Sequence, residues 1–89
     1  MEHIAIDLGG RESQICVRNE RGEILEEKRY LTANLSRYLA KRAPGARVLV
    51  ESSAEAFQVA EWARQHGHEP RVVPSSLVRA LGVGERGMK

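Results

Sequence analysis

Residues 3–10 read HIAIDLGG, an apolar run that holds one carboxylate, Asp7, and ends in two glycines. A short apolar run bounded by glycine is typical of a buried strand, which we expect over residues 3–8. Residues 47–51, RVLVE, repeat the pattern, with Glu51 at the last position. The two runs therefore predict two buried strands, each of which carries a carboxylate near its carboxyl end.

The segment between these strands predicts a hairpin. Apolar and polar residues alternate over residues 14–18, and residues 24–30 return as a third strand. Residues 19–23 form the loop between them, with Gly22 available for a positive φ. The run EEKR at residues 26–29 indicates an exposed edge, because charged side chains there discourage pairing with other chains.

Two helices are expected from their capping residues. Thr32 is a suitable N-cap for a helix that continues to about Arg42. Ser52 and Glu55 match a capping box, so a second helix is expected to begin directly after the second buried strand. Gly67 suits the C′ position that follows this second helix.

The last third of the chain completes an alternation of strands and helices. Residues 69–73 predict a fifth strand, and Ser75 is placed to cap a short helix through Leu81. The order of three strands, then helix, strand, helix, strand and helix, resembles the α/β ribonuclease H-like fold. That fold implies a mixed sheet in the order 3-2-1-4-5, with the first three strands antiparallel and the last two parallel to the first. We expect one such domain over residues 1–82, incomplete at its carboxyl end, and a loose glycine-containing tail over residues 83–89.

The composition fits one small domain and excludes several classes of protein. The chain has 89 residues, with 14 lysines and arginines against 12 aspartates and glutamates. Its single cysteine, Cys16, excludes an intramolecular disulfide framework and favours a reducing compartment. We find no signal peptide and no apolar run long enough to cross a membrane, and we therefore expect a cytoplasmic protein with no membrane partner.

Positive charge is concentrated in the last third of the chain. Residues 64–89 contain five basic and two acidic residues. This excess suits a polyanion such as a nucleic acid, whose phosphates bind lysine and arginine. The candidate nucleic-acid contacts are Arg71, Arg79, Arg86 and Lys89, and a solvated surface is the alternative for each.

Asp7 and Glu51 are the candidate catalytic and metal-binding residues. If their strands are parallel neighbours, both carboxylates lie at the end of the sheet where ligands bind in open α/β folds. Two carboxylates at one point favour Mg²⁺ or Mn²⁺, and paired ions of this kind support in-line phosphoryl transfer. The structural alternatives are that Asp7 caps the Gly9-Gly10 turn and that Glu51 faces the N-terminus of the next helix.

The other chemically reactive side chains have structural explanations. His66 and His68 are expected at an exposed helix end rather than in a metal site. Cys16 is expected to be a small core residue. Trp62 and Tyr38 are expected in helix packing rather than in base stacking.

Three stretches carry a resemblance to a known family. They are IAIDLGGRES with the hairpin after it, VLVESS before a helix, and HGHEPRVVPSSLVRAL. In this order and spacing they resemble the N-terminal part of the DEDD transposases of bacterial insertion sequences. These enzymes are relatives of the Piv DNA invertase and are known as bridge-RNA-guided recombinases. The resemblance covers nearly the whole chain.

The resemblance implies a RuvC-type domain that binds Mg²⁺ through four acidic residues. Asp7 and Glu51 match the first two, and the family's last two aspartates follow the segment that ends here at Lys89. The family also implies DNA as substrate, a guide (bridge) RNA as partner and a homo-oligomer of the full-length protein. The working enzyme is expected to cleave and exchange DNA strands, and the 89-residue chain alone is expected to be inactive.

Three alternatives stay open. Residues 7–10, DLGG, resemble the phosphate loop of sugar kinases and other actin-like ATPases, although Arg11 stands where that loop usually has threonine. A small Holliday-junction resolvase with an Asp-x-Gly opening is chemically close to the transposase, but it needs further acids near the C-terminus, where Glu85 alone is available. A non-enzymatic assembly module that self-associates through an exposed apolar face is the alternative outside enzymes.

Overall fold

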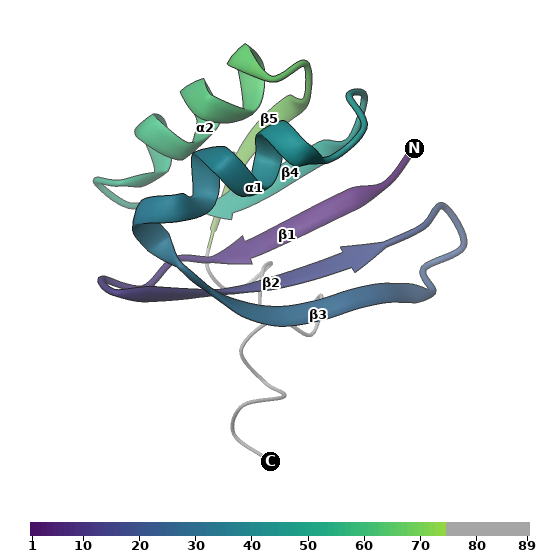
Figure 1. The fold of residues 1–89 in the computed structure, drawn as a ribbon, viewed down its shortest axis with the longest axis horizontal. Helices are drawn as coiled ribbons and strands as arrows, with labels where there is room; N and C mark the ends of the chain where they lie inside the picture. The colour runs from purple at the N-terminus through teal and green to yellow at the C-terminus, as the bar shows by residue number, and fades with distance from the viewer. Residues whose placement is uncertain (75–89) are drawn as a thin grey trace.

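The computed structural model describes residues 1–74, which form one sheet with helices packed against it (Figure 1). The elements in chain order are β1 (His3–Asp7), β2 (Glu12–Arg18), β3 (Ile24–Leu31), the 3-10 turn η1 (Thr32–Asn34), α1 (Leu35–Lys41), β4 (Arg47–Glu51), α2 (Ala56–Gln65) and β5 (Glu69–Val73).

The five strands lie in the order β3-β2-β1-β4-β5. β1 pairs antiparallel with β2, and β2 pairs antiparallel with β3. β1 pairs parallel with β4, and β4 pairs parallel with β5. The mixed α/β sheet and its strand order confirm the sequence prediction. β1 lies in the middle of the sheet. From the carboxyl end of β1 the chain turns to β2 on one side of it. From the carboxyl end of β4 the chain continues through α2 to β5 on the other side.

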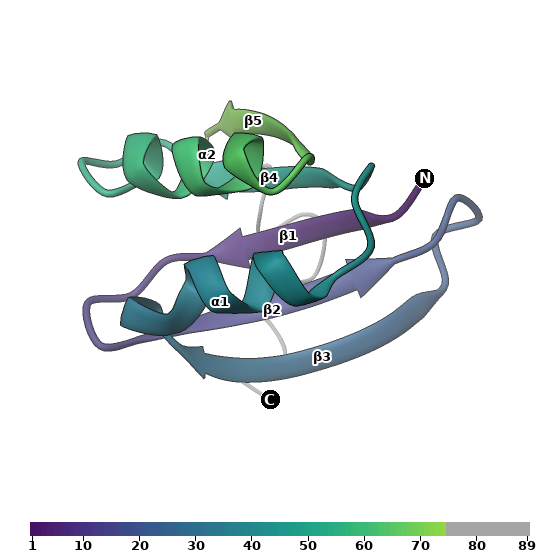
Figure 2. The same cartoon turned by 45° about the horizontal axis from the view of Figure 1, so that its top comes forward.

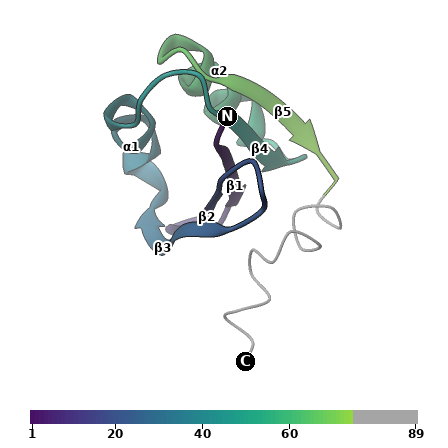
Figure 3. The same cartoon turned by 90° about the vertical axis from the view of Figure 1, so that its right-hand side faces the viewer.

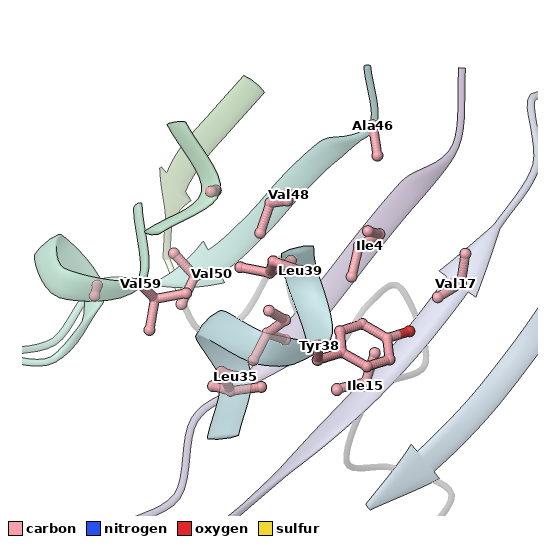
Figure 4. Packing of buried hydrophobic residues seen from close by; sticks show 13 residues of the cluster. Ile4, Ile15, Val17, Leu35, Tyr38, Leu39, Ala46, Val48, Val50 and Val59 are labelled. Carbon is pink, nitrogen blue, oxygen red and sulfur yellow. The ribbon is translucent and has the colours of Figure 1, made fainter. Parts of the chain in front are cut away.

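Both described helices cover the same face of the sheet (Figures 2 and 3). Apolar side chains at alternate positions of β1, β2 and β4 point to this face and pack against the helices. Burial of each large side chain contributes about 1.5–3 kcal/mol. Figure 4 shows the cluster, which includes Ile4, Ile6, Ile15, Val17, Leu35, Leu39, Val48, Val50 and Val59.

The first helix does not begin as the sequence predicts. Thr32 starts η1 rather than α1, and α1 begins at Leu35 with no side-chain hydrogen bond at its N-cap, Asn34. The Thr32 hydroxyl instead donates to the Gly9 carbonyl oxygen at 2.8 Å. The predicted cap is wrong because the Thr32 hydroxyl bonds to Gly9 and Ser13 rather than to an amide of the first helical turn.

The capping box predicted at Ser52 and Glu55 is also wrong. α2 begins at Ala56, four residues later than expected, and its N-cap Glu55 makes no side-chain hydrogen bond. The Ser52 amide donates to the Val73 carbonyl oxygen of β5 at 2.8 Å. This bond extends the sheet beyond the end of β4 and delays the helix.

The other boundaries agree with the sequence within two residues. β1 ends at Asp7, β2 begins at Glu12, and Gly67 has the expected positive φ, +84°. The helix expected over residues 75–81 and the tail over 83–89 lie outside the described residues, so the domain boundary at residue 82 stays a prediction. Within residues 1–74, neither α1 nor α2 combines the length and the apolar character that crossing a membrane requires.

Candidate functional site

Asp7 and Glu51 occupy equivalent positions on neighbouring parallel strands. The register pairs Ile6 of β1 with Val50 of β4, and Asp7 and Glu51 follow as the last residues of the two strands. Because Ile6 and Val50 point into the helix-covered core, Asp7 and Glu51 point to the opposite face. Adjacent strands lie about 4.8 Å apart, so the sheet holds these two residues side by side at its carboxyl end.

The two carboxylates have no described counter-ion. Both residues are half-buried, and within residues 1–74 neither carboxylate takes part in a hydrogen bond or an ion pair. Gln14 of β2 is the direct cross-strand partner of Asp7 and adds an amide oxygen to the same face. Gln14 was not predicted as part of the site, because its position beside Asp7 depends on the register of the hairpin. Adjacent carboxylates repel one another, and a divalent cation relieves that repulsion.

A closed ring of hydrogen bonds fixes the turn after Asp7. The Gly9 amide donates to the Ser13 hydroxyl oxygen at 3.3 Å, and the Thr32 hydroxyl donates to the Gly9 carbonyl oxygen at 2.8 Å. The two hydroxyl oxygens are 2.7 Å apart. Ser13 is the donor in this bond, because the hydroxyl proton of Thr32 is already donated to the Gly9 carbonyl oxygen. A Cβ on Gly9 would overlap the Glu12 carbonyl oxygen, so a side chain does not fit here.

The two structural alternatives for the acidic pair find no support in residues 1–74. The Gly9 amide is bonded to Ser13, and Asp7 makes no cap in the Gly9-Gly10 turn. Glu51 makes no hydrogen bond to the first turn of α2, which begins five residues after it. Among residues 1–74, the carboxylates of Asp7 and Glu51 therefore make no hydrogen bond or ion pair that would explain their position at the end of the sheet.

Arg71 is the one candidate nucleic-acid contact among the described residues. It lies on β5, is about half exposed, and donates to Glu69 at 3.2 Å. Its position is level with Leu49 of β4, two residues before the level of Glu51, and on the same face. The other three candidates, Arg79, Arg86 and Lys89, lie outside the described residues.

A second polar cluster joins β3 to α1 and the N-terminal segment. Arg42 donates to Glu26 at 2.8 Å and to Glu2 at 2.7 Å, and the Tyr38 hydroxyl donates to Glu26 at 2.8 Å. The cluster lines a groove of about 440 Å³ together with Lys28 and neighbouring side chains. Tyr38 was expected in packing, but this cluster was not predicted, since the three hydrogen bonds that join it connect residues 12 to 40 positions apart in the chain.

Electrostatics in this cluster favour the charged carboxylate. Burial acts to raise the pKa of Glu26, but hydrogen bonds from Tyr38 and Lys28 and the charges of Lys28 and Arg42 outweigh it and hold that pKa below its ordinary value of 4.5. Burial and the hydrogen bond to Glu26 raise the pKa of Tyr38 well above its ordinary value. The phenol therefore stays a neutral donor.

His68 has a structural role rather than the exposed position that the sequence predicts. It is 4% exposed, and its Nδ1 accepts the Ala46 amide at 3.3 Å while Nε2 lies 2.8 Å from the Leu39 carbonyl oxygen. This arrangement requires the neutral ring with the proton on Nε2. His68 thereby ties α1 to the start of β4. His66 is half-buried and lies 3.2 Å from the Ser36 hydroxyl.

No cluster of three or more histidine, cysteine, aspartate or glutamate side chains within residues 1–74 is placed to hold a metal ion. Asp7, Glu51 and Gln14 nevertheless offer the hard oxygen donors that Mg²⁺ and Mn²⁺ prefer. A hollow of about 270 Å³ on the same face lies at the other end of the sheet, among His3, Arg18 and Leu49, and does not include this pair.

The sequence matches no protein-family model and no curated protein.

Proposed function

We propose that Asp7 and Glu51 form part of a divalent-cation site for DNA strand cleavage and exchange. The chain would be the N-terminal portion of a DEDD-type transposase with a ribonuclease H-like, RuvC-type domain. The observation that carries the proposal is the equivalent position of these two carboxylates on adjacent parallel strands, on one face and without a counter-ion among residues 1–74. The sheet order 3-2-1-4-5, known to be compatible with that fold, supports it further.

The chemistry assigns separate tasks to the residues. Mg²⁺ or Mn²⁺ at this point supplies a Lewis acid for phosphoryl transfer. Asp7 and Glu51 would hold the cation through carboxylate oxygens, and Gln14, the cross-strand partner of Asp7, would add a neutral oxygen. The hydrogen-bonded ring around Gly9 positions the turn that follows Asp7. Water and the scissile phosphate would supply further oxygen ligands.

Polyanion binding and partners extend the same proposal. Arg71, Arg79, Arg86 and Lys89 would bind DNA phosphates. A guide RNA and a homo-oligomer of the full-length protein follow from the family resemblance, as does the expectation that the chain alone lacks recombinase activity. The proposal also includes a cytoplasmic location for the protein.

The kinase alternative has weaker support. A phosphate loop binds its ligand through free backbone amides of the glycine turn. Here the Gly9 amide is already bonded to Ser13, and the Gly9 carbonyl oxygen is bonded to Thr32. A phosphate that used the Gly9 amide would have to displace that ring of hydrogen bonds, whereas a cation at Asp7 and Glu51 would leave it intact.

Thermal unfolding with increasing Mn²⁺ tests the proposal. A ligand that binds the folded state alone stabilises it by about 2.7 kcal/mol at a hundredfold excess over Kd. We expect Mn²⁺ to raise Tm of the chain, and Asp7→Asn and Glu51→Gln each to abolish most of the rise. Without metal, both variants should be as stable as the parent or more stable by up to about 1 kcal/mol, because each removes a like-charge contact.

Glu61→Gln is the matched control, since Glu61 is an exposed carboxylate on α2 whose ion pair with Arg64 contributes little. It should keep the full Mn²⁺-dependent rise in Tm. A rise that survives in both Asp7→Asn and Glu51→Gln would contradict the proposal, as would a strong loss of stability in either variant without metal, which would indicate a structural cap.

A further inference from the structure

β3 leaves a long edge at one side of the sheet. It spans eight residues and lies at the end of the strand order, and within residues 1–74 no strand pairs with its outer side. Leu25 is 51% exposed and Leu31 is 44% exposed. An edge strand with unpaired backbone groups and exposed apolar residues is a template for pairing with another strand.

The side chains of β3 form two rows on opposite faces of the sheet. One row contacts Tyr38 of α1 and consists of Glu26, Lys28 and Tyr30. By alternation, the other row lies on the opposite face and consists of Leu25, Glu27, Arg29 and Leu31. This second row reads Leu-Glu-Arg-Leu. When a second copy of the row runs in the opposite direction, glutamate lies opposite arginine and leucine lies opposite leucine.

We propose that two copies of this chain pair antiparallel through the outer edges of β3, with Lys28 of each copy opposite Lys28 of the other on a two-fold axis. In this register Glu27 lies opposite Arg29 of the second copy, and Leu25 lies opposite Leu31 of the second copy. Two-fold symmetry makes each of these contacts twice. Opposite charges and apolar pairs that face one another across strands stabilise a sheet.

The apolar pair, together with the charges, distinguishes this register from its neighbours. Residues that lie opposite in an antiparallel pair share a face, so the register can shift only in steps of two along each pair. The next register in one direction brings Glu27 opposite Glu27, and the next in the other direction brings Arg29 opposite Arg29. Like charges directly opposite are destabilising. The register centred on Arg29 forms no opposite-charge pair. The register centred on Glu27 pairs Glu26 with Lys28 on the other face, so its charges balance as well as those of the register centred on Lys28. Only the register centred on Lys28 also places Leu25 opposite Leu31.

Two features of β3 are compatible with the pairing. The like charges of the two Lys28 side chains are offset, because each lies 3.0 Å from Glu26 of its own copy. The register shift between β2 and β3, which leaves Leu25 as the extra residue, falls at the end of the paired segment rather than at its centre. The charged run at residues 26–29 thus discourages other chains but matches a second copy.

The pairing makes one continuous sheet from two five-stranded sheets. In each copy one face of the sheet carries no helix of residues 1–74, and these two faces lie on the same side. The two β1 strands are then five strand spacings apart, about 24 Å across the sheet. If the proposed function holds, the two Asp7–Glu51 sites lie on one face of the dimer. The dimer itself does not depend on that function, and its test involves no metal.

Charge-reversal variants test the interface by their assembly in solution. The full chain should dimerise in sedimentation equilibrium between about 1 μM and about 1 mM, the range in which weak specific dimers form. Glu27→Arg and Arg29→Glu each place like charges opposite one another, so each should raise the dimer Kd at least about tenfold. An equimolar mixture of the two variants restores both opposite-charge contacts and should form a heterodimer about as tight as the parent dimer.

Arg37→Glu is the matched control, because Arg37 is exposed on α1 and its reversal changes net charge as Arg29→Glu does. It should leave the dimer Kd within about twofold of the parent, and circular dichroism should show that all variants fold. A parent chain that stays monomeric over the whole range would overturn the proposal. So would a mixture of the two β3 variants that remains monomeric, or an Arg37→Glu variant that dissociates like Arg29→Glu.

Discussion

Gly9 shows how one residue combines steric and hydrogen-bonding constraints next to the candidate site. Its amide and its carbonyl oxygen both bond into the ring with Ser13 and Thr32, and a Cβ at this position would overlap the Glu12 carbonyl oxygen. Gly10, the next residue, has open space where a Cβ would lie. The two glycines that the sequence presents as one signal therefore have different roles. Gly9 packs the turn after Asp7, and Gly10 only continues it.

Substitution of the two glycines should separate these roles. Gly9→Ala should destabilise the fold by about 1–3 kcal/mol, because its methyl group overlaps backbone atoms that cannot rotate away. Gly10→Ala should change the free energy of unfolding by no more than about 0.5 kcal/mol. Urea unfolding of both variants measures the difference. Equal effects of the two substitutions would mean that the turn is not packed as described.

At the scale of elements, the β3 edge is tied to α1 and to the N-terminal segment by charged groups rather than by apolar packing alone. Tyr38 contributes its ring to the core and its hydroxyl to Glu26, and Tyr30 packs edge-on against it with ring centroids 5.2 Å apart. Arg42, just after α1, bonds to both Glu26 and Glu2. Stability of this part of the fold consequently depends on the charge of Glu26.

The pKa of Glu26, lowered in the folded state, predicts a loss of stability in acid. The stabilisation from this carboxylate is fully present above its ordinary pKa of 4.5 and is lost as pH falls through the lower folded-state value. Glu26→Gln should cost about 1 kcal/mol at neutral pH, a charged hydrogen-bond contribution reduced for partial exposure. The difference in unfolding free energy between parent and variant should shrink as pH falls below 4.5.

Tyr38→Phe is the companion variant, because it removes only the hydroxyl that donates to Glu26 at 2.8 Å. It should weaken the acid dependence without abolishing it, since Lys28 and Arg42 still favour the carboxylate. Thermal unfolding from pH 7 down to about pH 3 makes the comparison. A parent-to-Glu26→Gln difference that stays constant over this range would refute the linkage.

For the whole molecule, apolar runs and turn residues were sufficient to predict the five strands, and the resemblance of their succession to the ribonuclease H-like fold predicted the order of the sheet. The runs at residues 3–8 and 47–51 bury one face in the helices, and that burial fixes which face receives Asp7 and Glu51. The helix starts could not be predicted, because Thr32 bonds to Gly9, which lies 23 residues away. The Arg42 cluster, the neighbour position of Gln14 and the buried His68 likewise depend on contacts between distant segments. Local patterns carry no signal for such contacts.

The central claim is that Asp7 and Glu51 bind one divalent cation together. The most direct measurement is paramagnetic broadening of the amide NMR signals by substoichiometric Mn²⁺, which falls off steeply with distance from the ion. The account predicts selective broadening at the carboxyl ends of β1 and β4 and around Gln14, lost in Asp7→Asn and in Glu51→Gln. Broadening centred on the Glu2–Glu26 cluster, or broadening that persists unchanged in both variants, would contradict it.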